Sequence, residues 1–172
     1  MIYRLLAAAE VPCLVKPMRE LADYHNRVAK SFAGCYPVIP VEKQLGELAE
    51  QIEAKKGMAE AIFDGEDVVG FGAATFEGHY GNIDFLYIRE ELRRKRHGHR
   101  LLKNMLAFLR ANGVTFIDLK VVRGNPARRF YENHGFRPRT EVMTMRIPDD
   151  SSAAPTATPP DPGEGHAENH RD

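Results

Sequence analysis

The chain has 172 residues, the usual size of one domain, and 43% of them are hydrophobic, which is a globular composition. Its 24 basic residues equal its 24 acidic ones, so the chain as a whole is not a polyanion binder. Two cysteines cannot build a disulfide framework, and no apolar run approaches the roughly 20 residues that span a membrane. We therefore expect a cytoplasmic protein with no membrane partner.

The composition changes sharply near the end of the chain. Residues 149–172 contain no aliphatic residue larger than alanine, no aromatic residue, and several prolines. They also hold six acidic residues and one basic residue, which leaves residues 1–148 with a formal charge of +5. A segment that cannot bury apolar surface does not offset its ordering entropy. We expect a folded domain at 1–148 and a disordered, acidic, Pro/Ala-rich tail at 149–172.

Hydrophobic periodicity predicts alternating helices and strands along the domain. Asp64-Gly65 is a strong hairpin signal between two apolar runs, and Asn125-Pro126 is typical of a helix start. The order of elements indicates an α/β (or α+β) sheet protein with one βαβ unit. The expected elements are a strand at 3–9, helices at 17–32 and 41–52, strands at 59–63, 68–76 and 83–88, a helix at 98–111, a strand at 114–122, a helix at 127–134 and a strand at 142–147.

The junction between the strand at 83–88 and the helix at 98–111 carries the clearest chemical signal. The first turn of a helix offers unpaired N–H groups and a positive dipole end, which suit a phosphate. Basic side chains crowd this junction: Arg93, Arg94, Lys95, Arg96 and Arg100, with His97 and His99 among them. Three other interpretations stay open: a solvated basic face, a nucleic-acid patch, and a helix start without a ligand.

Together with a downstream segment, this junction resembles the GNAT family of acyl-CoA N-acyltransferases. The family's pyrophosphate loop, [Gln/Arg]-x-x-Gly-x-[Gly/Ala], corresponds to Arg93-x-x-Arg96-x-Gly98. Its later helix, Ala-x-x-Phe-Tyr-x-x-x-Gly-Phe, corresponds to residues 127–136. The resemblance covers about residues 58–147. It implies a mixed, mostly antiparallel sheet with helices on both faces.

The same resemblance implies acetyl-CoA as a co-substrate, without a metal. The loop would bind the pyrophosphate, and the end of the preceding strand would bind the pantetheine arm through its backbone. Arg96 replaces the family's first glycine, so either it adopts a costly positive φ or the loop keeps a negative φ. Asn125 stands one residue after the family's asparagine and could act only as a helix cap. The implied cofactor-binding residues are Leu86, Tyr87, Ile88, Arg93, Arg94, Lys95, Arg96, His97, Gly98, His99, Asn125 and Phe130.

Catalysis in such an enzyme needs a proton donor for the thiolate and a base for the amine. The resemblance places Tyr131 at the donor position, although its spacing also fits an ordinary core aromatic. Asp84 is our first candidate base, because strand alternation predicts that it shares a face with Leu86 and Ile88. Glu77 is an alternative base, as is His79 in the same loop; both also fit ordinary loop residues.

We therefore expect an N-acetyltransferase that passes the acetyl group of acetyl-CoA directly to a primary amine in a ternary complex. The acceptor would be a small molecule or a peptide, and a homodimer is one state to test. Two alternatives stay open: a regulatory module that binds acyl-CoA without chemistry, and an acetyltransferase that acts on a protein or an aminoacyl-tRNA. Apart from that tRNA case, we expect no nucleic-acid partner.

Overall fold

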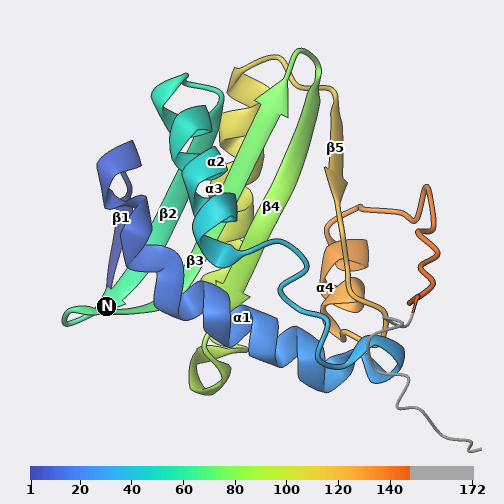
Figure 1. The fold of residues 1–172 in the computed structure, drawn as a ribbon. Coiled ribbons are helices and arrows are strands. Elements are labelled where there is room, and N and C mark those ends of the chain that lie inside the picture. The colour runs from blue at the N-terminus through green and yellow to red at the C-terminus, as the bar shows by residue number, and fades with distance from the viewer. Residues whose placement is uncertain (148–172) are drawn as a thin grey trace, which may run out of the picture. The chain divides into compact units, whose positions relative to one another are not determined.

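The computed structural model describes residues 1–147, which belong to two units: Met1–Phe136, and a second unit that begins at Arg137. Within the first unit, one five-stranded sheet has the order β1-β2-β3-β4-β5 (Figure 1). Strands β1 to β4 are antiparallel neighbours, whereas β4 and β5 are parallel. The strands are β1 (Ile2–Leu5), β2 (Gly57–Asp64), β3 (Asp67–Glu77), β4 (Tyr80–Ile88) and β5 (Phe116–Leu119).

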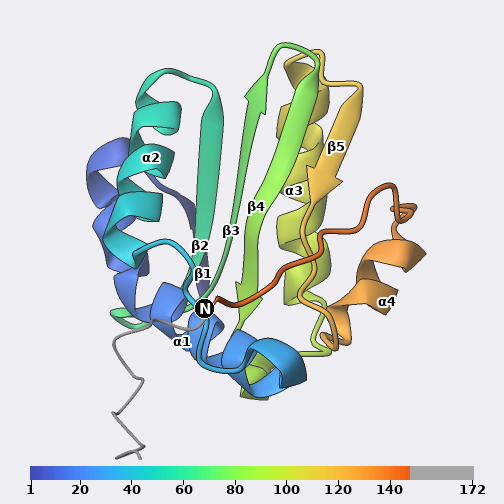
Figure 2. The same cartoon turned by 45° about the vertical axis from the view of Figure 1, so that its right-hand side comes forward.

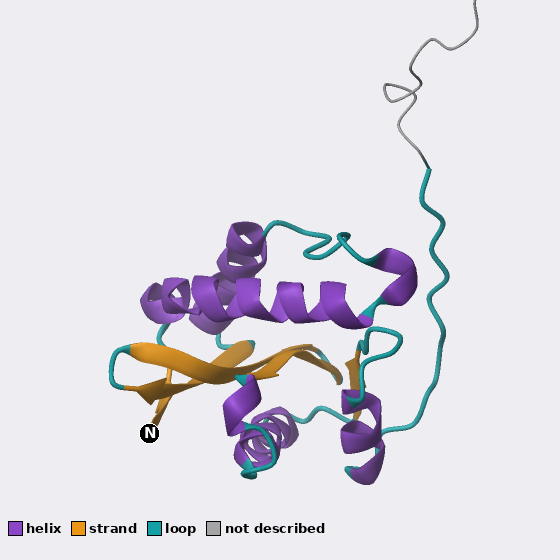
Figure 3. Cartoon of the chain, turned by 90° about the horizontal axis from the view of Figure 1, so that it is seen from below, coloured by secondary structure: helices purple, strands orange, loops and turns teal. Residues whose placement is uncertain are grey.

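Helices cover both faces of this sheet (Figure 3). On one face, α1 (Val15–Val28) and α2 (Val41–Glu53) pack on a core that includes Phe71 and Ala73 of β3. On the other face, α3 (His97–Ala111) buries Leu102, Met105 and Leu109. The short helix α4 (Ala127–Asn133) contributes Phe130 and Tyr131 to that second core. Burial on both faces explains why β3 is apolar almost throughout.

The parallel pair β4 and β5 separates partway along its length. Their pairing runs only from Tyr80↔Phe116 to Ile83↔Leu119, while β4 continues to Ile88 (Figure 2). The sequence predicted a strand at 114–122, and the observed β5 is shorter at both ends. The last residues of β4 therefore have a strand neighbour on the β3 side only, among the residues described.

A β-bulge lies in β4 where this separation begins. Ala74 pairs with Ile83, and Ala73 pairs with Phe85, so Asp84 is the extra residue. A bulge of this kind interrupts the strict alternation of side chains along a strand. It decides which face of the sheet Asp84 occupies, as described below.

Residues 137–147 contain neither helix nor strand. The strand expected at 142–147 is therefore absent, and its alternating sequence was not sufficient, because a strand forms only when a neighbour takes up its backbone hydrogen bonds. The tail expected at 149–172 lies outside the described residues.

Candidate active site

The end of β4, beyond the last residue that pairs with β5, presents backbone groups at an open edge of the sheet. Arg89 N donates to Val69 O at 2.9 Å, which directs Arg89 toward β3. Backbone groups in an antiparallel strand alternate in direction, so those of Ile88 and Leu86 point away from β3. The Ile88 carbonyl already accepts a hydrogen bond from Arg93 Nε at 3.1 Å. This edge can pair with an extended chain of amides, as a further strand would.

The first turn of α3 follows this edge in the chain. Its first intrahelical bond runs from Arg100 N to Arg96 O, at 3.1 Å. The N–H groups of His97, Gly98 and His99 precede that bond, so they have no acceptor within the helix. No side chain of the described residues caps this end. The turn therefore provides adjacent donors at the positive end of the helix dipole.

Two arginines adopt left-handed backbone conformations in the loop before α3. Arg94 has φ 62°, and Arg96 has φ 64°. The alternative of a loop that keeps a negative φ at Arg96 is therefore wrong. A residue with a Cβ in this conformation costs roughly 1–2 kcal/mol. The Arg96 side chain is exposed, so it takes up this backbone shape without burial.

Three of the predicted cofactor-binding residues meet at Gly98. A Cβ added at Gly98 would lie 3.8 Å from Ile88 Cγ1 and 3.9 Å from Phe130 Cζ. The end of β4, the start of α3 and α4 are thus in contact around one glycine. Leu86, Phe130 and Tyr131 also pack against the same apolar core.

The basic side chains of the junction do not point in one direction. Arg93 turns toward α1, where its guanidinium carbon lies 4.4 Å from the centre of the Tyr24 ring. On the opposite side, His97 Nδ1 and the Tyr3 hydroxyl share a hydrogen bond, and the Arg100 guanidinium lies 3.5 Å from the centre of the Tyr3 ring. Arg94, Lys95 and Arg96 are exposed.

A pair of histidines joins the start of α3 to the end of α4. His134 Nδ1 lies 2.7 Å from the Phe130 carbonyl, which can only accept, so this nitrogen carries the proton. His134 Nε2 is then an acceptor in the neutral ring, and it lies 2.8 Å from His99 Nδ1. Asn125 holds the other end of α4, because its Oδ1 accepts from Ala127 N at 2.9 Å. The capping role considered for Asn125 is therefore present.

Tyr131 lies on α4 with its ring partly buried. The ring contacts Phe130 and Phe136 edge-on, with centroids 5.2 Å and 5.9 Å away. Burial raises the pKa of Tyr131 to about 12, so the phenol keeps its proton at neutral pH. Its hydroxyl has no hydrogen-bond partner among the described residues.

Asp84 does not share a face with Leu86 and Ile88, as alternation had predicted. The bulge turns it to the opposite face, the one covered by α1 and α2, where Thr75 Oγ1 donates to Asp84 Oδ2 at 2.8 Å. Asp84 is exposed as a whole residue, and its carboxyl group lies against β3 through this hydrogen bond. Desolvation raises the pKa of Asp84 to about 6, opposed by the Thr75 hydrogen bond and by the charge of Lys120 after β5.

Of the remaining sequence candidates, Glu77 and His79 lie away from the open edge, and Tyr87 lies in it but turns its side chain toward α1. Glu77 is at the β3–β4 hairpin, 80% exposed, in an ion pair of 2.7 Å with Lys56. His79 Nδ1 lies 3.0 Å from the Gly113 carbonyl in the same region. Tyr87 is buried against α1, where its hydroxyl donates to Glu20 Oε2 at 2.8 Å.

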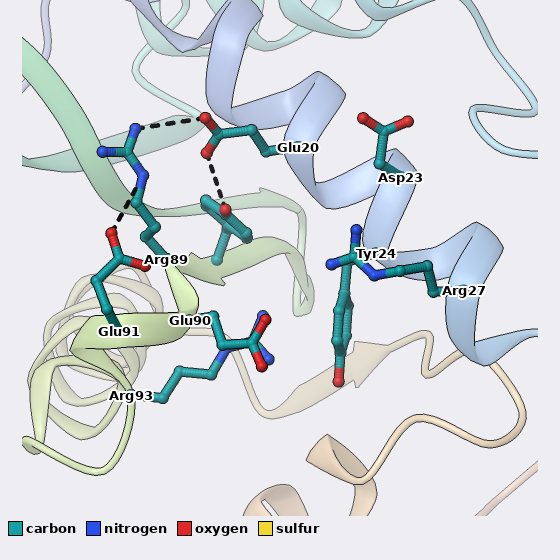
Figure 4. Close-up of a pocket in the computed structure, with 9 residues that line it drawn as sticks. Glu20, Asp23, Tyr24, Arg27, Arg89, Glu90, Glu91 and Arg93 are labelled. Carbon is teal, nitrogen blue, oxygen red and sulfur yellow. Dashed lines mark hydrogen bonds and ion pairs between the residues drawn. The ribbon is translucent and has the colours of Figure 1, made fainter.

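Sequence reasoning missed an open cavity of about 230 Å³ between α1 and the end of β4 (Figure 4). Its wall on α1 includes Glu20, Tyr24 and Arg27, whose spacing places them on one helical face. Arg89 lies opposite and reaches Glu20 Oε1 at 3.3 Å. Residues 20, 24 and 27 form a polar stripe beside the apolar stripe of the predicted helix, and this pattern was the sequence signal for the cavity.

No group of three or more metal-binding side chains occurs within residues 1–147. Across the same residues, the helices are too short or too polar to cross a bilayer.

Comparison with solved structures supports the fold. A predicted acetyltransferase of Clostridium acetobutylicum, solved with acetyl-CoA, is 15% identical and has a TM-score of 0.67 over 84% of this chain and 95% of its own. The PaiA N-acetyltransferase of Thermoplasma acidophilum, in complex with coenzyme A, is 17% identical with a TM-score of 0.64 over 80% and 91%. An aminoglycoside acetyltransferase from an uncultured soil metagenomic sample, in complex with trehalose, is 16% identical with a TM-score of 0.59 over 87% and 96%. At these identities the likeness shows the fold.

Sequence comparison identifies the family. No curated protein sequence matches this chain significantly. The model of the acetyltransferase (GNAT) family, however, matches residues 21–136, which run from within α1 to just past α4. They include the open edge of β4 and the start of α3. The chain therefore belongs to the GNAT family of acetyltransferases.

Proposed function

We propose that this chain is an N-acetyltransferase that passes the acetyl group of acetyl-CoA to a primary amine by direct attack in a ternary complex. One observation carries the proposal. The open edge of β4 lies beside the uncapped first turn of α3, where Gly98 approaches Ile88, so amide-pairing groups and diphosphate-binding groups are adjacent. Acetyl-CoA presents amides and a diphosphate in one extended molecule. Membership of the GNAT family supports the same assignment.

The cofactor would bind along the chain in order. The pantetheine amides would pair with the backbone of Leu86 and Ile88. The diphosphate would accept hydrogen bonds from the amides around Gly98, with charge-assisted bonds from the exposed arginines of the loop. The two left-handed arginines shape the loop toward that site, which gives a reason for their strained backbone.

The chemistry would proceed in one transfer. A neutral amine attacks the thioester carbonyl carbon, and the backbone N–H of Ile88 stabilises the oxyanion that forms. The C–S bond then breaks, and the thiolate takes the proton of the Tyr131 hydroxyl. The pKa of Tyr131, about 12, lies above the ordinary thiol value of about 8.5, so this proton transfer is uphill. Solvent completes it by returning a proton to the phenolate.

The acceptor would approach from the α1 face. Asp84 lies on that face beside the separation of β4 and β5, and we propose it as the base that removes the amine proton, directly or through water. Glu77 is the other candidate base, but its place at the β3–β4 hairpin, in an ion pair with Lys56, favours Asp84. The cavity beside Tyr24 adjoins the same opening, because Arg93 lines it and also contacts the Ile88 carbonyl. Its mixture of acidic and basic side chains suits a polar acceptor, a small molecule or a peptide.

The first experiment measures thermal unfolding with and without acetyl-CoA, followed by thiol release with a panel of primary amines. We expect a ligand-dependent rise in Tm and release with at least one amine. In Tyr131→Phe, the rise should persist while turnover falls. A missing Tm rise would contradict cofactor binding, whereas unchanged turnover in Tyr131→Phe would remove only the assigned proton donor.

A second candidate function is a module that binds acyl-CoA without transferring it. Arg96 favours it, since an arginine at a left-handed loop position bears a cost that a glycine would avoid. The panel of amines separates the two functions, because a module of this kind shows the Tm rise and releases no thiol with any acceptor.

A further inference from the structure

A second cavity, of about 440 Å³, lies at the opposite edge of the sheet from the β4–β5 separation. Its walls come from the end of β1, from β2 and α3, and from Ile52 of α2, and its lining is largely apolar. Leu5 of β1 forms an exposed lip, 65% accessible, directly opposite Glu60 of β2 in the strand register. This volume falls in the range of small-molecule sites, roughly 300–1,000 Å³.

Glu60 is the unusual member of this lining. It is 6% exposed and is the one buried charged residue in the described part of the chain. Its two same-face neighbours on β2, Met58 and Ile62, belong to the apolar cores under α3. A carboxylate at such a position is costly to bury unless a partner compensates it.

The compensation that Glu60 receives is incomplete. Asn104 Nδ2 of α3 donates to Glu60 Oε2 at 2.8 Å, and this donor is neutral. The nearby Arg100 guanidinium is placed over the Tyr3 ring instead of on Glu60. No ion pair to Glu60 and no hydrogen bond to its Oε1 occur within residues 1–147. The cavity therefore contains a carboxylate with room for a cationic donor.

We propose that this cavity binds a small organic cation, an ammonium group on a short apolar body. The ammonium would lie against Glu60 Oε1, and the apolar body would cover Met58, Leu5 and Phe108. The charge of the site selects a cation over a neutral or anionic analogue, and the apolar walls select against inorganic cations, which would lose hydration without gaining oxygen ligands. The site is separate from the proposed active site and does not depend on its chemistry.

The test is calorimetric titration of the full chain with hexylammonium, 1-hexanol and hexanoate at neutral pH, in the absence of acetyl-CoA. Hexylammonium should bind, and the other two should bind at least about tenfold more weakly, because a hydrogen bond to a charged group is lost. Glu60→Gln keeps an acceptor for Asn104, and in this variant the affinity for hexylammonium should fall to that for 1-hexanol. Ala107→Phe should fill the cavity and abolish binding of both hexylammonium and 1-hexanol.

Asp84→Asn is the control, since it alters the carboxylate that we propose as the base for the amine in the active site. Hexylammonium binding that survives in Asp84→Asn and disappears in Glu60→Gln assigns the site. Equal binding to the wild type and Glu60→Gln, or no binding at millimolar amine, would overturn the proposal. So would a stable dimer that Ala107→Phe dissociates, because a second copy would then occupy the cavity. A cooperative thermal unfolding transition, measured by far-UV circular dichroism without acetyl-CoA, reports whether each variant is folded.

Discussion

The left-handed backbone of Arg96, just before α3, predicts that glycine at this position stabilises the fold. Arg96 has φ 64° and ψ 6°, and its side chain is exposed. Arg96→Gly should relieve about 1–2 kcal/mol of strain. It should also increase the freedom of the unfolded chain, which costs about 0.4–1 kcal/mol. The difference is a net stabilisation of about 0.8 kcal/mol from the mid-range values, within limits of about 0 and 1.6 kcal/mol.

Lys95 provides the matched control within the same loop. It is exposed and carries the same charge, but it does not have a positive φ. Lys95→Gly should therefore destabilise by the unfolded-state effect alone, about 0.4–1 kcal/mol. The two variants lose one positive charge each, so their difference isolates the strain, about 1–2 kcal/mol.

Thermal and urea unfolding of both variants measure this difference. For a chain of this length, about 1 kcal/mol corresponds to roughly 2–4 °C in Tm, so the two Tm values should differ by about 2–8 °C. If Arg96→Gly and Lys95→Gly shift stability in the same direction by similar amounts, the strain assigned to Arg96 does not exist. A stabilised Arg96→Gly that also binds acetyl-CoA as well as the wild type would show that the loop shape does not need the arginine.

Three further substitutions test the geometry of the site. Gly124→Ala should destabilise the fold by about 2–5 kcal/mol, because its Cβ would lie 2.6 Å from the Val28 carbonyl oxygen at a φ of 93°. A variant that unfolds at the same urea concentration as the wild type would contradict the close approach of α1. Gly98→Ala should keep or raise stability, by up to about 1 kcal/mol, because the added Cβ meets only ordinary contacts. The acetyl-CoA-dependent Tm rise of this variant should nevertheless shrink. An undiminished rise would mean that the diphosphate does not approach this backbone. The pKa of Asp84 is raised, so its ionisation destabilises the folded state progressively as pH rises from 3.8 to about 6. Asp84→Asn should therefore raise Tm at neutral pH and leave it unchanged near pH 3.8. In the same variant, the rise of kcat/KM with pH through about 6 should disappear. Equal Tm gains at both pH values would contradict the raised pKa of Asp84.

Local sequence patterns determined most of the secondary structure. The apolar stripes of α2 and α3 and the Asp64-Gly65 turn need only residues close in the chain, so periodicity and turn chemistry were sufficient. The two family motifs placed Gly98 and Phe130 at one site, and the structure brings them together with Ile88. Chain order also predicted the βαβ unit, because a parallel neighbour requires a crossover.

Tertiary structure decided the features that depend on partners distant in the chain. The face of Asp84 follows from an extra residue in the β3–β4 ladder, which single-strand alternation cannot reveal. The missing strand at 142–147 and the short β5 depend on whether a neighbouring strand is present. The environment of Glu60 arises only when β1, β2 and α3 meet. Periodicity records which residues a chain tends to bury, whereas electrostatic environment and strand pairing depend on what the folded chain places beside them.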